Sequence, residues 1–103
     1  MPELIKELGK VAGELSQLIS KSSDPEEKKT LLEKYRTISQ QLENAAHQQF
    51  EENDEFFVAV IKQIKKTEKD IQKYNARQAG LFDLFKSLSQ LIENVFRLCL
   101  GWK

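Results

Sequence analysis

The only histidine in the chain, His47, has Glu43 and Glu51 four residues away on either side, so a helix would place these side chains on one face. Histidine beside carboxylates is typical of metal and acid–base sites. A carboxylate-bridged di-metal bundle needs paired Glu-x-x-His motifs, however, and this chain lacks that spacing. No nucleophile is linked to His47 by a recognisable motif. We therefore expect a solvated histidine, no metal, no cofactor, no catalytic residue and no small-molecule substrate. The chain is not predicted to be an enzyme.

A row of basic residues is the second feature with possible chemistry. The row consists of Lys62, Lys66, Lys69, Lys73 and Arg77. Cations at this helical spacing can follow phosphates or anionic lipid head groups. A solvated helix face is the simpler interpretation, because Glu68 and Asp70 lie nearby. The chain carries 16 acidic and 16 basic residues, so no net charge steers it toward nucleic acid or a membrane.

Cys99 is the only cysteine, so the chain cannot form an internal disulfide. This composition fits a reducing compartment. The amino terminus also shows no basic leader followed by an apolar run, which a secretory signal would require. We therefore expect a cytoplasmic protein in which Cys99 is a small core residue.

The elements that must position these residues are predicted to be helices. Apolar residues recur at spacings of three and four over approximately 3–21, 25–52, 54–78 and 81–100. Asp24 can cap the second helix, Pro25 suits its first turn, and Glu27 completes a capping-box spacing. Gly80 is free to adopt the left-handed conformation that closes helices. The sequence predicts an all-α protein with a single helical domain over residues 1–103, most simply an antiparallel four-helix bundle.

The boundary between the second and third helices leaves an alternative open. Residues 51–55 contain capping and acidic residues, but no Gly or Pro marks a turn. The apolar register also continues through this region. A three-helix chain with one long central helix from Pro25 to Ala79 is therefore possible. Such a rod would be about 80 Å long at ~1.5 Å per residue, and a second copy would have to cover it in a swapped dimer.

The last predicted helix has a wider apolar face than one small bundle needs. At about 100° per residue, its apolar residues span roughly 200°. A face of this width usually meets more than one neighbour. We expect the interface with a partner or with a second copy to contain Phe82, Leu91, Phe96, Leu98, Leu100 and Trp102.

Three functions follow as hypotheses. The first is a non-catalytic interaction protein (an adaptor, chaperone or regulatory subunit) that self-associates or binds a partner helix through its C-terminal helix. The second is a membrane-active bundle whose C-terminal helix lies in a lipid interface, a position that Trp102 beside Lys103 would suit. The third is nucleic-acid binding through the basic row, which we expect least because the chain has no net charge.

Overall fold

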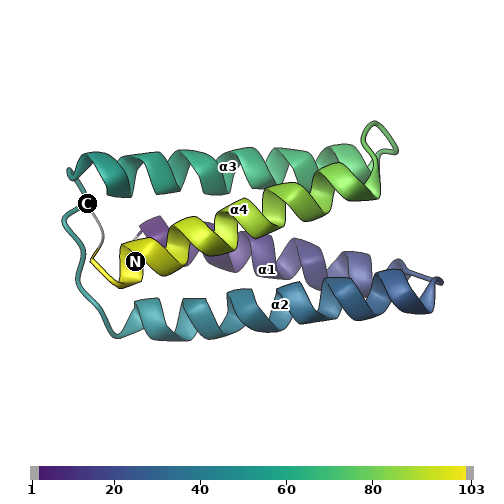
Figure 1. Cartoon of the computed structure of the whole chain (residues 1–103), viewed down its shortest axis with the longest axis horizontal. Helices are drawn as coiled ribbons and strands as arrows, with labels where there is room; N and C mark the ends of the chain where they lie inside the picture. The colour runs from purple at the N-terminus through teal and green to yellow at the C-terminus, as the bar shows by residue number, and fades with distance from the viewer. Residues whose placement is uncertain (1–2, 102–103) are drawn as a thin grey trace.

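The computed structural model, which describes residues 3–101, consists of four helices joined by three connections (Figure 1). The helices are α1 (Glu3–Lys21), α2 (Pro25–Ala46), α3 (Glu55–Asn75) and α4 (Leu81–Cys99). Consecutive helices run in opposite directions along a body that measures 40 × 23 × 22 Å (Figure 1). The predicted all-α fold and four-helix bundle are confirmed.

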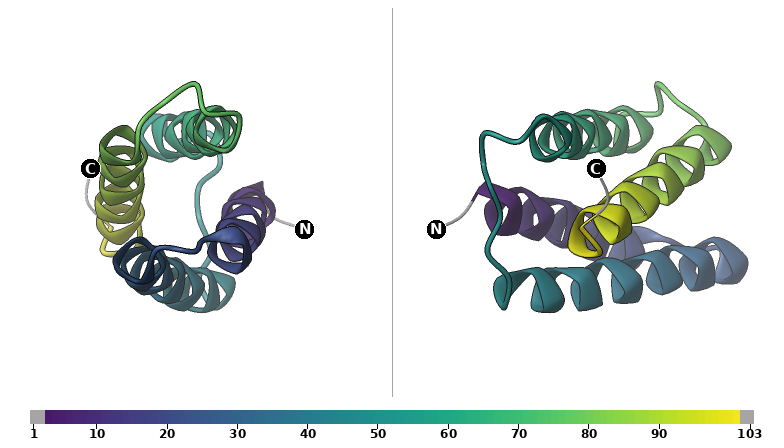
Figure 2. Two further views of the ribbon diagram at one scale, coloured as in Figure 1. Left: turned by 90° about the vertical axis from the view of Figure 1, so that its right-hand side faces the viewer. Right: turned by 60° about the vertical axis from the view of Figure 1, so that its left-hand side comes forward.

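The helices form a ring in the order α1, α2, α4, α3, as the view along the bundle shows (Figure 2, left). The α2–α3 connection crosses the end of the bundle to the diagonally opposite position. As a result, α1 lies parallel to its neighbour α3, and α2 lies parallel to its neighbour α4. Two contacts between helices agree with this order. Lys65 on α3 pairs with Glu3 on α1, and the Gln41 side chain on α2 donates to the Ile92 carbonyl on α4. Helices that follow one another in the chain are thus antiparallel, whereas the neighbouring pairs α1–α3 and α2–α4 are parallel.

The connection between α2 and α3 decides between the two predicted architectures. The predicted helix 25–52 ends at Ala46, and residues 47–54 fold back as a loop. Phe50 anchors this loop on the bundle, with its ring centroid 5.9 Å from that of Phe57. Asp54 then caps α3 by accepting the Phe57 backbone N–H at 3.3 Å. The alternative of one long central helix in a swapped dimer is therefore wrong. A half-buried aromatic anchor and a cap make the turn without Gly or Pro.

Two predicted helix-end features differ in the structure. Asp24 does cap α2, accepting the Glu26 N–H at 3.1 Å, but the Glu27 carboxylate accepts the hydroxyl proton of Tyr74 on α3. Glu27 therefore ties the start of α2 to the end of α3. At the far end of α3, Gly80 has an ordinary φ of −85° and precedes α4, so the prediction of a left-handed glycine there is wrong.

Arg77 takes the left-handed conformation instead, with φ at 62°. Its N–H donates to the Tyr74 carbonyl at 3.0 Å, and the Gln78 N–H donates to the Lys73 carbonyl at 2.7 Å. These paired bonds define a Schellman ending for α3. The left-handed residue that ends α3 is therefore Arg77, three residues before Gly80. The Cβ of Arg77 disfavours the left-handed conformation.

One hydrophobic core receives side chains from all four helices. Its fully buried large residues are Leu4, Leu8, Val11, Leu15, Leu31, Ile38, Val60, Ile64, Ile71, Leu84, Leu88 and Leu91. The predicted 3-4 spacing places them on the inner faces. Across residues 3–101, no helix has the length and apolar character needed to cross a bilayer.

Candidate interaction surface

The two sides of α4 differ in how well the bundle covers their apolar residues. The inner side is buried, with Leu88 and Leu91 fully inaccessible to solvent. On the outer side, Phe82 is 78% exposed, Phe96 is 58% exposed and Leu100 is 60% exposed. Globular proteins commonly expose single apolar residues, but three large ones along one helix are a candidate contact surface.

We call the exposed side of this helix the outer stripe of α4. It consists of Phe82, Lys86, Ser89, Glu93, Phe96 and Leu100, all exposed. At about 100° per residue these positions fall within about 80° of the helix circumference. The stripe therefore presents apolar residues at its two ends and polar residues between them.

The structure divides the predicted interface residues into two groups. Phe82, Phe96 and Leu100 lie on the outer stripe. Leu91 and Leu98 are buried in the bundle core, so their assignment to an exposed interface is corrected: they face the neighbouring helices of the same chain. Trp102 lies outside the described residues. The wide apolar arc is real, but most of it serves the core, because α4 packs against both α2 and α3.

A groove of about 310 Å³ lies beside the stripe, between the C-terminal ends of α2 and α4. Phe96 and Leu100 form an apolar wall, and Cys99 together with polar side chains of α2 and the following loop lines the rest. Gln41 is 8% exposed at this groove, and its Nε2 donates to the Ile92 carbonyl at 2.8 Å. Its Oε1 accepts no hydrogen bond from any residue between 3 and 101. A buried acceptor without a donor is rare in folded proteins.

His47, the histidine examined for metal or catalytic chemistry, is an exposed residue at the end of α2 and lines the same groove. Within the described range, no group of three His, Cys, Asp or Glu side chains is placed to hold a metal ion. The absence of catalytic function stays a prediction.

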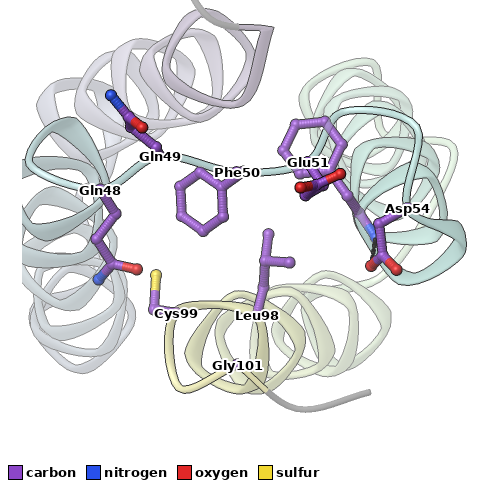
Figure 3. Close-up of a pocket in the computed structure, with 9 residues that line it drawn as sticks. Gln48, Gln49, Phe50, Glu51, Asp54, Leu98, Cys99 and Gly101 are labelled. Atoms are coloured by element: carbon purple, nitrogen blue, oxygen red, sulfur yellow. Dashed lines mark hydrogen bonds between the residues drawn. The ribbon is translucent and has the colours of Figure 1, made fainter.

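A second cavity of about 210 Å³ lies at the end of the bundle, beneath the α2–α3 loop. Phe50 from the loop and Leu98 and Cys99 from α4 point toward this space (Figure 3). Burial raises the pKa of the Cys99 thiol, which keeps the thiol protonated near neutral pH. Cys99 therefore packs between loop and helix and has the properties of a small apolar residue.

The predicted basic row follows the exposed side of α3 and ends in the α3–α4 connection. Lys62, Lys69 and Lys73 are exposed, Lys66 pairs with Asp70 at 3.0 Å, and Arg77 occupies the left-handed position. Lys66 and Lys73 also line a cleft of about 420 Å³ toward α4 that contains Asp70 and Asp83. Carboxylates thus lie among the cations, and the row has less net charge than its spacing suggests.

Polar side chains join α3 to α4 behind this cleft. The buried Ser87 hydroxyl donates to Asp70 at 2.7 Å and lies 3.1 Å from the hydroxyl oxygen of Thr67. Burial raises the pKa of Asp70, but the hydrogen bonds from Ser87 and Lys66 outweigh burial and bring it below its ordinary value. The network holds the carboxylate in its charged form. It is satisfied internally, so it needs no ligand.

Two carboxyl groups meet between α1 and α3. Glu7 is 5% exposed and hydrogen-bonds to Glu68. Burial and the bond and charge of Glu7 raise the pKa of Glu68 to about 7. Burial also raises the pKa of Glu7, but the bond from Glu68 and the charge of Lys10, 3.5 Å away, outweigh it and lower the pKa overall. Glu68 therefore stays protonated in mildly acidic solution, and its O–H donates a hydrogen bond to the Glu7 carboxylate.

Sequence reasoning missed these polar contacts, although a signal for them exists. Glu7 interrupts the apolar spacing between Leu4 and Val11, and Thr67 lies between Ile64 and Ile71 on the buried face of α3. Polar residues at such positions are buried if the helix holds its register. Their partners across the bundle depend on the ring order of the helices, which the spacing does not contain.

Comparisons with protein-family models, with curated proteins and with solved structures find no match for this chain. The outer stripe of α4 and the adjoining groove are therefore assessed on their own geometry.

Proposed function

We propose that this protein is a non-catalytic interaction module, an adaptor, chaperone or regulatory subunit, that binds a helix of another protein molecule through the outer stripe of α4. The observation that carries the proposal is the exposure of Phe82, Phe96 and Leu100 on a helix whose opposite side already fills the core. An exposed apolar stripe on a rigid helix is the surface that helix-in-groove recognition uses.

The groove beside the stripe supports the same proposal. Its apolar wall is formed by Phe96 and Leu100, and its volume of about 310 Å³ can hold bulky side chains of a bound helix. Lys86 and Glu93 lie between the apolar ends of the stripe, so a bound helix would contact apolar side chains at both ends and charged ones in the middle.

Photo-crosslinking in cells that produce the protein tests the proposal directly. Benzoylphenylalanine replaces Phe82 or Phe96, and the matched control carries the same group at Val58, an apolar residue of α3 that is 39% exposed. We expect crosslinked protein bands from the first two positions and none from the third. Unfolding curves of all variants must match that of the parent chain, so that any crosslink reports the folded surface.

The same experiment separates the proposal from its alternatives. Equal bands from all three positions, or no protein bands at all, would contradict it. Crosslinks to lipid from position 96 would favour the membrane-active bundle instead. Nucleic-acid binding through the basic row predicts retention on heparin that weakens steeply with salt and disappears when Lys62 and Lys69 are changed to Gln. The cytoplasmic location stays a prediction from the single cysteine.

A further inference from the structure

The outer stripe of α4 has a symmetry in its spacing that identifies a specific occupant. Phe82 lies seven residues before Ser89, and Phe96 lies seven residues after it. If two α4 helices lie antiparallel with Ser89 at the two-fold axis, Phe82 of each copy meets Phe96 of the other. The small Ser89 side chain at the centre lets the two helices approach closely, and both phenylalanines are exposed and free to make this contact.

The charges of the stripe are nearly symmetric about the same centre. Lys86 lies three residues before Ser89 and Glu93 four residues after it, on one flank of the stripe. In an antiparallel pair of helices, residues of the same flank face each other across the contact. Lys86 of each copy therefore lies near Glu93 of the other, and the contact contains two opposite-charge pairs. Within each copy Glu93 also pairs with Arg97 at 2.8 Å, so its carboxylate would be shared between the two cations. A parallel pairing would place like charges at the same height and would not bring the phenylalanines together in this way.

We infer that a second copy of this chain is the occupant of the outer stripe, bound through an antiparallel α4–α4 contact centred on Ser89. The inference rests on the proposed function and specifies its partner. Phe82 of each copy enters the end of the α2–α4 groove of the other, beside Phe96 and Leu100. The two-fold symmetry closes the contact at a dimer, because each stripe is used completely.

The affinity of this dimer is expected to be modest. Each copy contributes three large apolar side chains, which corresponds to the small, transient class of interface. Lys34 on α2 donates to Ser89 Oγ at 3.1 Å, so its ammonium group approaches that of the second copy near the axis. We expect a dissociation constant on the order of 10–100 μM. A dimer of this strength can exchange with other partners of the same surface.

Disulfide trapping tests the predicted geometry. In a Cys99→Ser background, Ser89→Cys places one thiol of each copy at the axis, within reach of its symmetry mate. We expect this full-length variant to form a covalent dimer under mild oxidation. The matched control, Asp83→Cys, is at an exposed position of α4 outside the stripe and keeps both phenylalanines. It is not expected to form the covalent dimer, because antiparallel pairing separates its thiols by about 18 Å at ~1.5 Å per residue. Trapping at 83 and not at 89, or at both to the same extent, would overturn the inference.

Charge exchange provides an independent test. Lys86→Glu and Glu93→Lys each place like charges across the contact, and each is expected to weaken dimerisation by about 3- to 10-fold. The double variant K86E/E93K restores opposite pairs and should return the dissociation constant to within about 2-fold of the parent value. Sedimentation equilibrium measures all three. Absence of recovery in the double variant would contradict the antiparallel register.

The two proposals fail in different ways. If the parent chain is monomeric at millimolar concentration but Phe82 and Phe96 still crosslink to a foreign protein in cells, the self-association inference is wrong and the proposed function stands. If neither self-association nor crosslinking occurs, both are wrong. A crosslinked band of twice the 12.0 kDa chain mass supports both.

Discussion

The two pairs of parallel helices in this bundle, α1–α3 and α2–α4, differ in how completely the fold covers the side chains at their contacts. Between α1 and α3, the Glu68 carboxyl hydrogen-bonds to the Glu7 carboxylate, which also pairs with Lys10. Between α2 and α4, large apolar side chains remain exposed beside a groove, and Gln41 keeps one acceptor without a donor among residues 3–101. The first contact satisfies its polar groups internally, whereas the second has apolar surface left uncovered. This difference fits a role in folding for the α1–α3 contact and supports the binding role that we propose for the α2–α4 side.

The largest expected effect separates the folding role of α4 from its binding role. Leu91→Ala removes a fully buried side chain from the core, and it should lower the free energy of unfolding by about 2–5 kcal/mol. Leu100→Ala changes a side chain that is 60% exposed, and it should lower that free energy by less than about 0.5 kcal/mol. Urea unfolding at low protein concentration measures both. Equal losses would show that the outer stripe contributes to folding as the inner face does.

A smaller effect concerns the pH dependence of the α1–α3 contact. Glu68 has a pKa of about 7 in the fold against an ordinary value of 4.5, so the folded state binds more protons between these values. Stability should therefore fall as pH rises from 4.5 to 7. The lowered pKa of Glu7 affects stability in more acidic solution. Its contribution to the free energy of unfolding is lost as pH falls below 4.5.

Glu68→Gln keeps a hydrogen-bond donor toward Glu7 and removes the titration. Its unfolding free energy should be flatter between pH 4.5 and 7, and higher than that of the parent by about 1 kcal/mol above pH 7, after allowance for solvent screening. Thermal unfolding across a pH series measures the difference. Glu43→Gln, at an exposed position of α2, is the control and should leave the pH profile unchanged. Parallel profiles for Glu68→Gln and the parent would contradict the raised pKa of Glu68.

The smallest expected effect lies in the connection from α3 to α4, which links the two contacts. Arg77→Gly removes the Cβ that disfavours a φ of 62°, and it should raise the free energy of unfolding by about 1 kcal/mol. Gly80→Ala, at a φ of −85° with open space around the added methyl group, should be tolerated. Differential scanning calorimetry compares the two. A loss of stability in Arg77→Gly would mean that the arginine side chain contributes more than its backbone conformation costs.

Much of the fold could be predicted from local patterns, because helical periodicity determines which residues face the core. The spacing of Leu4, Leu8, Val11 and Leu15 places α1 with the observed bounds, and Asp24 and Pro25 mark the start of α2. The turn after Ala46 could not be resolved in the same way. Its anchor is the contact of Phe50 with Phe57, and an apolar residue in a loop looks like one more position of a helical stripe.

The candidate site could be predicted only in part. The excess apolar width of α4 is visible in the sequence, and it correctly includes Phe82, Phe96 and Leu100 as exposed residues. Which members of the arc are covered depends on the ring order of the helices. Because α4 has neighbours on two sides, Leu91 and Leu98 are buried and leave the outer stripe. The periodicity of the sequence gives the width of the apolar face of a helix, and tertiary packing determines how much of that face remains exposed to solvent.

The central claim, that the outer stripe binds a second copy, is tested most directly by sedimentation equilibrium of the full chain over a concentration series. Self-association through the outer stripe should give a monomer–dimer equilibrium with a dissociation constant on the order of 10–100 μM, weakened at least about 10-fold by Phe96→Glu. Val58→Glu on α3 should leave it unchanged. A strict monomer throughout the series, or a dimer that Phe96→Glu leaves intact, would contradict the claim.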